Sequence, residues 1–241
     1  MKKFAHLIVL CLLLHSVFAQ RESEPTVTLK WAPTGLILGD LSFQGEYGFI
    51  NKSSLTAKIG LPFNHSYRAN FDGHEVTMSM KAFSFLAGYR KYLSKQMLKG
   101  FYIEPFFTYA HHLSDGIGQG SLDNQPVTMD FTNAYNGVGL GIQLGSQFII
   151  AKRFVIDLFF FGPQVTSSTN NFRAIDYKNS TAWNNIQADE AEQDIQNFLN
   201  QFPFIKNKVN VHVDPPNKTV VADFAGALVG LRFGVSFGIA L

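Results

Sequence analysis

Hydrophobic residues occupy alternate positions in several segments of this chain, and the C-terminal segment shows the pattern most clearly. From Leu231 to Leu241, Leu, Phe, Val and Ile alternate with small or polar residues. Successive side chains of a β-strand point to opposite faces, so this segment has one apolar face and one small or polar face. The pattern predicts a strand that separates an apolar environment from a closely packed polar one.

The same alternation recurs along the chain and gives about eight strands. In the segment from Asn136 to Phe148, apolar residues share one face, and glycines and glutamines share the other. A dinucleotide-binding motif needs its glycines in a turn between a strand and a helix, so these glycines predict no nucleotide cofactor. The remaining predicted strands are 27–31, 41–49, 55–61, 76–93, 101–109 and 153–161.

One predicted strand contains a break in the pattern. In the segment 76–93, the alternation changes phase near Ala82 and Phe83. Before the break, Met78 and Met80 share the apolar face, which places Lys81 on the polar one. A phase change of this kind is typical of a β-bulge, which inserts one extra residue into a strand, so we expect a bulge here.

Composition favours a membrane protein over a soluble sheet protein. Charged residues make up 16% of the chain, below the roughly 25% of soluble domains, and 24 of its 241 residues are Phe. No segment after residue 19 is apolar for the roughly 20 residues that a membrane helix needs. A closed barrel pairs its backbone hydrogen bonds between strands. The expected fold is therefore all-β, a transmembrane antiparallel β-barrel of about eight strands.

The first 19 residues predict export. A short positive region, an apolar run at 7–14 and small residues at Val17 and Ala19 follow one another. This layout is typical of a secretory signal peptide, so we expect residues 1–19 to be removed and residues 20–241 to form the barrel domain. Removing the two signal-peptide lysines leaves 18 Lys and Arg (20 − 2) against 18 Asp and Glu, a balance that predicts no nucleic-acid partner.

The predicted connections are short at one end of the barrel and longer at the other, as in outer-membrane barrels. The short turns lie near Asn51, Ser94 and Ala151, and the long external loops are 63–74, 111–135 and 164–224. Any external partner is expected to bind these loops. Outer-membrane lipid and, during biogenesis, the barrel-assembly machinery are the other expected partners.

The last of these loops contains a predicted short helix. Acidic residues at 189–192 precede Ile195, Phe198 and Leu199, which follow helical spacing, and Pro203 ends the segment. A single apolar stripe usually means packing, so we expect the helix to cap the barrel mouth. A partner-binding element is the alternative.

Charged residues fall on the predicted inward faces. A barrel of this size is filled by side chains, and isolated buried charges are costly, so we expect a paired network rather than a pore lining. The predicted interior charge network consists of Lys30, Glu46, Lys58, Lys81, Arg90, Glu104, Asp157 and Arg232.

One short motif raises the possibility of catalysis. His112 and Ser114 are two residues apart beside Asp115, and this resembles the His-x-Ser arrangement of outer-membrane lipid A deacylases. Ser, His and an acid are the ingredients of acyl transfer. Odd-numbered residues of this strand are predicted to face lipid, which turns His112 and Ser114 inward, away from a lipid substrate. The main prediction is therefore no enzymatic activity. No histidines have metal-ligand spacing, so we expect no metal or other cofactor.

Three longer stretches, Gly39–Gly48, Arg90–Pro105 and Leu231–Gly238, carry a family resemblance. Together they resemble an uncharacterised family of small outer-membrane barrels with a domain of unknown function, of the eight-stranded OmpA and OmpX type. The resemblance implies location in the outer membrane of a Gram-negative cell and implies no particular activity.

Three functions follow as hypotheses. The leading one is an outer-membrane barrel with a structural or surface-interaction role and an interior plugged by polar side chains. The first alternative is a lipid-modifying acyl hydrolase similar to the lipid A deacylases. The second is a soluble lipocalin-like carrier, in which an apolar cavity and a polar exterior would reverse the two faces.

Overall fold

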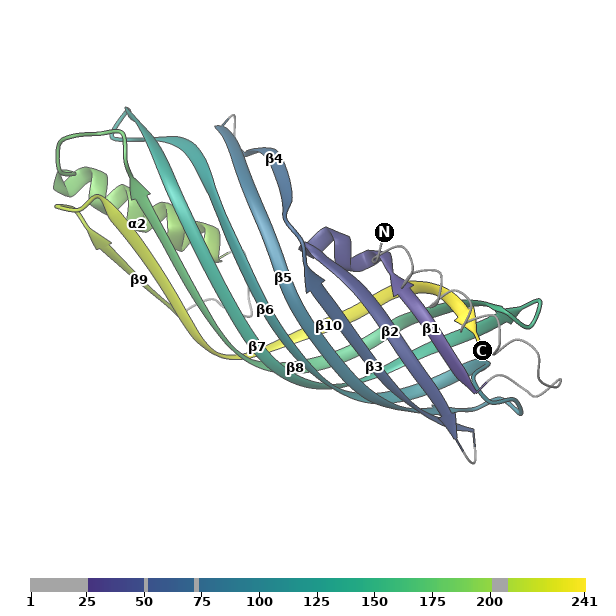
Figure 1. Cartoon of the computed structure of the whole chain (residues 1–241). Coiled ribbons are helices and arrows are strands. Elements are labelled where there is room, and N and C mark those ends of the chain that lie inside the picture. The colour runs from purple at the N-terminus through teal and green to yellow at the C-terminus, as the bar shows by residue number, and fades with distance from the viewer. Residues whose placement is uncertain (1–25, 50–51, 72–73, 201–207) are drawn as a thin grey trace, which may run out of the picture.

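Eight antiparallel strands close into a ring (Figure 1). The computed structural model describes residues 26–49, 52–71, 74–200 and 208–241, so the predicted signal peptide lies outside the described residues. The prediction of an all-β fold with about eight antiparallel strands is confirmed. In their order around the ring, the strands are β1 (Val27–Ala32), β2 (Asp40–Phe49), β3 (Ser53–Pro62), β5 (His74–Tyr92), β6 (Gly100–Leu122), β7 (Gln125–Ile150), β8 (Phe154–Asp176) and β10 (Thr219–Ala240).

The first and last strands complete the ring. β1 pairs with β2 on one side and with β10 on the other, so that Thr28 lies opposite Ala240 and Trp31 opposite Phe237. The backbone N–H of Leu241 also donates to the carbonyl oxygen of Val27 at 2.9 Å. Because every strand of the ring has two neighbours, this part of the sheet has no free edge.

Five of the strands continue well beyond the ring. β6, β7 and β8 contain 23, 26 and 23 residues, which corresponds to roughly 75–85 Å at about 3.3 Å per residue. Their outer parts form an open sheet with β4 (His65–Phe71), which pairs with β5, and β9 (Val209–Asp214), which pairs with β10 (Figure 1). We call this sheet and its helix the extension. It comprises residues 65–71, 74–82, 111–136, 167–176, 185–200 and 209–227.

The extension corrects the prediction of three long loops. Region 111–135 is a continuous hairpin of β6 and β7, closed by the two-residue turn Asp123–Asn124, and both turn residues have positive φ (49° and 57°). Asx residues tolerate this conformation, which tight hairpins require. Region 63–74 contains β4, and region 164–224 contains the end of β8, a helix, β9 and the start of β10. The predicted loops are thus mainly strands.

The helix of the extension, α2 (Asn185–Asn200), begins before the predicted acidic start. The backbone N–H of Gln187 donates to Asn184 Oδ1 at 2.9 Å, and the backbone N–H of Asn184 donates to Gln187 Oε1 at 3.0 Å. This reciprocal pair is a capping box, which fixes the helix start. Within the described residues, no helix has the length and apolar character to cross a membrane.

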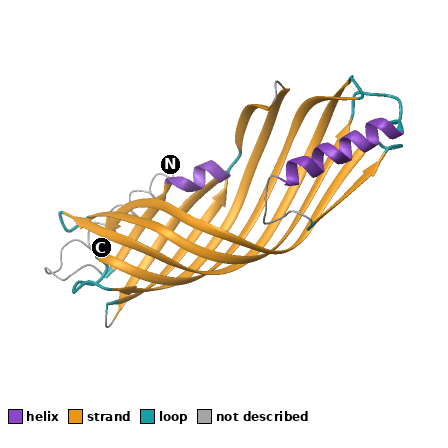
Figure 2. Cartoon of the chain, turned by 180° about the vertical axis from the view of Figure 1, so that it is seen from behind, coloured by secondary structure: helices purple, strands orange, loops and turns teal. Residues whose placement is uncertain are grey.

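α2 lies against the inner face of the extension, at the end far from the ring (Figure 2). Trp183, Ala191 and Ile195 pack there against apolar residues of the sheet, including Leu122 and Val220. The predicted position of the helix over the barrel mouth is therefore wrong. A 3-10 helix, η2 (Pro33–Leu38), lies beside the mouth of the ring instead.

β5 contains no bulge where its hydrophobic pattern changes phase. Its register against β6 is regular, with Val76 opposite Gly118 and Tyr92 opposite Tyr102. The prediction of a bulge near Ala82 is therefore wrong. Register shifts occur instead between β7 and β8 and between β10 and β8. The shifts bury Phe159 inside the ring and leave both Phe160 and Phe161 exposed.

Candidate functional site

Five charged side chains from five strands meet inside the ring, and we call them the ionic core: Lys30, Glu46, Arg90, Glu104 and Asp157. Lys30 Nζ lies 2.7 Å from both Glu46 Oε2 and Asp157 Oδ2. Arg90 Nη1 lies 2.7 Å from Asp157 Oδ2, and Arg90 Nε lies 2.6 Å from Glu104 Oε2. The carboxylates and Lys30 are fully buried. The regular alternation of side chains between the two faces of each strand places all five residues on the inward face. This alternation could be followed in the sequence because it is not interrupted in these segments.

Neutral donors satisfy the carboxylate oxygens that the two cations leave open. Ser54 and Tyr92 donate to Glu46 Oε1, each at 2.6 Å, and Tyr102 donates to Asp157 Oδ1 at 2.7 Å. Thr56 donates to Glu104 Oε1, and Gln143 donates to Glu104 Oε2 at 2.6 Å. All six carboxylate oxygens of the ionic core therefore have a partner. This matters because an unpaired buried charge is strongly destabilising.

Small residues on the inward face of β7 make room for the aromatic side chains of β6. A Cβ atom at Gly141 would lie 2.5 Å from Phe106 Cζ, and a Cβ atom at Gly145 would collide with the Tyr102 ring. The glycine run of this strand is thus explained by close packing inside the ring. The ionic core leaves no carboxylate or amine free for acid–base chemistry, so its arrangement suits a plug rather than a catalytic centre.

Three of the eight predicted network residues do not join the ionic core. Lys81 is exposed on the outward face of β5, so its assignment to the interior was wrong. Lys58 and Arg232 point inward but lie closer to the mouth of the ring. The Arg232 guanidinium carbon is 4.8 Å from the centroid of the Phe106 ring. Arg232 therefore rests on the aromatic side chains next to the ionic core.

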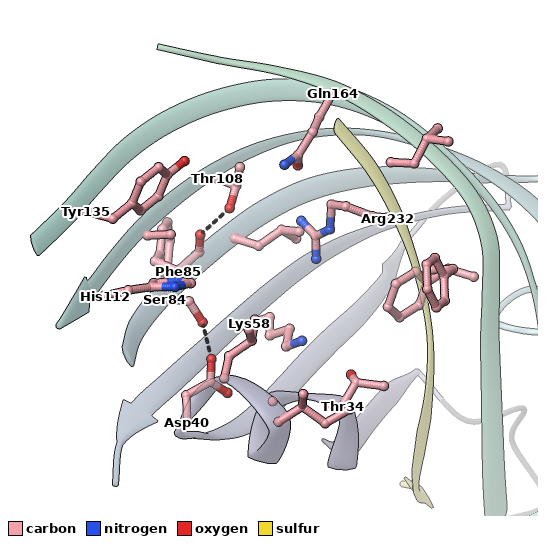
Figure 3. A pocket seen from close by; sticks show the side chains of 18 residues that line it. Thr34, Asp40, Lys58, Ser84, Phe85, Thr108, His112, Tyr135, Gln164 and Arg232 are labelled. Carbon is pink, nitrogen blue, oxygen red and sulfur yellow. Dashed lines mark hydrogen bonds between the residues drawn. The ribbon is translucent and has the colours of Figure 1, made fainter. Parts of the chain in front are cut away.

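A cavity of about 560 Å³ lies at the mouth of the ring, between η2 and the strands (Figure 3). Lys58, Arg232, Gln164 and His112 line it together with Asp40. Asp40 accepts hydrogen bonds from Ser42 at 2.5 Å and Ser84 at 3.1 Å. The cavity thus combines polar side chains from β2, β3, β6, β8 and β10.

The structure does not bring the three candidate catalytic residues together. His112 lines the cavity at the mouth, where its ring packs edge-on against Tyr135 at 5.5 Å between centroids. Ser114 and Asp115 line a separate hollow, and Asp115 is exposed. His112 and Asp115 are three residues apart on one strand and therefore point to opposite faces, so Asp115 cannot orient His112.

Sequence reasoning missed several neutral partners of the network. Tyr92, Tyr102, Gln143 and Gln147 all contact the ionic core, and Gln147 Oε1 lies 2.6 Å from Lys30 Nζ. Each of them faces inward, because it lies an even number of positions from a charged inward residue on its own strand or opposite one on the adjacent strand. A search for polar side chains at inward-facing positions would have identified them.

The described residues contain no group of three His, Cys, Asp or Glu side chains that could hold a metal ion. Comparisons of the chain with protein-family models, curated proteins and solved structures found no match. The resemblance to a family of small outer-membrane barrels therefore stays a prediction.

Proposed function

We propose that this protein is an outer-membrane β-barrel with a structural or surface-interaction role, whose ring crosses the membrane and whose extension stands outside it. The observation that carries the proposal is a continuous apolar outer surface on the ring. Leu140 on β7 and Leu231 on β10 are 67% and 65% exposed. Exposure of so many large apolar side chains on one continuous surface is unfavourable in water and favourable in lipid.

The outward face becomes more polar where the extension begins. On the outward face of β7, Leu140 and Val138 are followed by Asn136, Thr132 and Asp130. The same change occurs on three further strands of the ring: from Phe83 to Lys81 on β5, from Val165 to Ser167 on β8, and from Val229 to Asp223 on β10. On β6, between β5 and β7, Tyr109 is followed by His111, but Leu113 and Ile117 keep part of the outward face apolar. A boundary shared by adjacent strands is the pattern expected at the edge of a bilayer.

The height of the apolar surface suits a membrane. On β7 it runs from Val138 to Ile150, a span of about 40 Å along the strand at about 3.3 Å per residue. With a strand tilt of about 45°, this corresponds to about 28 Å across the membrane, close to the apolar band of about 25 Å in outer-membrane barrels. On the outward face of the extension, Ile117 is 44% exposed but lies opposite Asp130, so apolar and polar residues are mixed there and the continuous band ends.

The interior supports a structural role more than transport or catalysis. The ionic core fills the ring, which argues against an open channel. A lipocalin-like carrier would need a polar exterior, and the ring has the reverse arrangement. The separation of His112 from Asp115 argues against the acyl hydrolase.

Cell fractionation combined with gel mobility tests the proposal. The unheated protein is expected in the outer-membrane fraction as a compact species whose mobility changes after boiling. In planar bilayers, the purified protein is expected to give no large, stable conductance. Recovery in the soluble periplasmic fraction would overturn the membrane assignment, and a persistent large conductance would overturn the plugged interior.

A further inference from the structure

The cations that point into the ring differ in their surroundings. Lys30 and Arg90 each contact at least two carboxylates of the ionic core. Among the described residues, Lys58 and Arg232 have no carboxylate within 4.0 Å. Two cations that share a partly desolvated space without a close counter-ion are electrostatically unfavourable.

Both of these cations face the cavity at the mouth, as Figure 3 shows. Its volume of about 560 Å³ lies within the roughly 300–1,000 Å³ typical of small-molecule sites. Phe159 and Leu86, both buried, contribute apolar surface to its lining. The ionic core closes the ring beyond it, so a molecule that enters from the mouth would be held rather than passed on.

Other polar groups of the cavity do not neutralise the two cations. The Asp40 carboxylate is held by Ser42 and Ser84, and it supplies one negative charge against the two positive charges of Lys58 and Arg232. Gln164 lines the same cavity, and among the described residues its Oε1 has no hydrogen-bond donor. The cavity lining therefore has a surplus positive charge and an amide oxygen without a donor. The ionic core beyond it, with three carboxylates and two cations, supplies one further negative charge, but none of its carboxylates lies within 4.0 Å of Lys58 or Arg232.

We infer that this cavity binds a small organic anion, whose carboxylate or phosphate group is held between Lys58 and Arg232. A guanidinium group presents paired N–H donors to a planar carboxylate or a phosphate, and the ammonium group adds a second positive contact. The apolar part of the ligand packs toward Leu86 and Phe159. The site lies at the end of the ring that carries the extension, so the ligand enters from that side.

Thermal unfolding of the folded protein in nonionic detergent tests the inference. Sodium benzoate and phenyl phosphate are the anionic probes, benzyl alcohol is the neutral probe, and sodium chloride keeps the ionic strength equal. At millimolar concentrations, at least one anion is expected to raise the unfolding temperature of the wild type, because a ligand that binds only the folded state stabilises it. Benzyl alcohol is expected to have no effect. The anion with the larger shift identifies the preferred group.

Three variants locate the binding site. Arg232→Met and Lys58→Met are each expected to weaken the anion effect at least tenfold, whereas Lys81→Met, which removes an exposed lysine from the outer surface, is expected to keep it. Without anion, Lys58→Met is expected to unfold at a higher temperature than the wild type, because the repulsion from Arg232 is gone. If Arg232→Met fails to fold, Lys58→Met alone decides.

Two results would overturn the inference. One is a wild type that neither anion stabilises beyond the chloride control. The other is an anion effect that survives in Lys58→Met. The heat-dependent gel mobility of the same samples shows separately whether the barrel is folded. Failure of the anion site is therefore distinguishable from failure of the proposed membrane role.

Discussion

Five strands run through both the ring and the extension, but the polarity of their inward and outward faces is reversed between the two parts. On β7, inward residues are polar in the ring, as at Gln143 and Gln147, and apolar in the extension, as at Val127 and Met129. The strand stays in register with β6 throughout. Because side chains keep their alternation along a continuous strand, only the surroundings change. In the proposed arrangement, lipid surrounds the ring and water surrounds the extension, while α2 supplies the apolar partner for the inner face.

This inversion explains why the hydrophobic pattern of β5 changes phase without a bulge. In the ring part, Phe83 and Phe85 face outward, whereas Met78 and Met80 in the extension face inward. A shift in the apolar phase can thus mark a change of environment along a straight strand. The same misinterpretation placed Lys81 inside the ring, because the methionines were assumed to face lipid.

Removal of a core cation is expected to have the largest effect on the ring. Arg90→Met leaves Glu104 and Asp157 without their closest guanidinium contacts, and breaking a buried pair in this way costs about 3–5 kcal/mol. Arg173→Met is the matched control, because Arg173 is an exposed cation of the extension. It is expected to change stability by less than about 0.5 kcal/mol. Urea unfolding followed by gel mobility measures both, and equal losses would contradict the distinction between the two regions.

The lipid boundary gives the next largest expected effect. Leu140→Arg places a charge on the apolar outer surface of β7, which faces lipid in the proposed arrangement, where it would cost about 2–4 kcal/mol near the bilayer midplane. Thr132→Arg introduces the same charge on the same face of the same strand, beyond the boundary, and is expected to fold normally. Folding yield into lipid vesicles distinguishes the two. A Leu140→Arg variant that is stable and water-soluble would favour the lipocalin-like carrier.

Much of the ring was predictable from the sequence, because its two faces contrast strongly. Alternation of Leu, Ile and Phe with small or polar residues predicts strands, and parity alone puts Lys30, Glu46, Arg90, Glu104 and Asp157 on inward faces. Closure of the ring by β1 was harder to predict, since that strand has only six residues and runs directly into Pro33. Its pairing with β10 depends on contacts between the two ends of the chain.

The extension was less predictable, since its strands lack the strong apolar face of the ring. Outward residues such as Thr132 and Asp130 resemble loop residues, and part of the inner face is covered only once α2 has packed. The helix itself was predicted from Ile195, but its start at Asn185 depends on the capping box of Asn184 and Gln187. Where α2 docks depends on long-range packing that a local pattern cannot specify.

Substitutions at two adjacent residues test whether the inward face of the extension is the apolar one. Val220 is 2% exposed beneath α2, and Val221 points to the other face of β10. Val220→Thr buries a hydroxyl group in an apolar cluster, which is expected to cost about 1–3 kcal/mol. Val221→Thr is expected to cost less, because its hydroxyl can reach water. Hydrogen exchange of α2 measures the difference, and faster exchange in Val221→Thr than in Val220→Thr would reverse the assignment of faces.

Acidification is expected to loosen the extension before the ring, and this is the smallest predicted effect. Asp176, at the outer end of β8, is buried, which alone would raise its pKa. Hydrogen bonds from Asn179 at 2.6 Å, Trp183 at 3.4 Å and the backbone of Thr128 hold the pKa below its ordinary value instead. A carboxyl group whose pKa is lower in the folded state stabilises that state above the pKa of the unfolded chain. This stabilisation decreases as the pH falls through the folded-state pKa.

The expected window therefore begins near pH 4, where an unfolded Asp side chain titrates. Trp183 fluorescence reports the event in a Trp31→Phe background, since these are the two tryptophans of the chain. Its emission is expected to shift toward that of exposed Trp below this pH, while gel mobility shows an intact ring. Asp176→Asn should remove the pH dependence, because the amide cannot ionise. An unchanged acid transition in Asp176→Asn would show that another carboxyl group anchors the helix end of the extension.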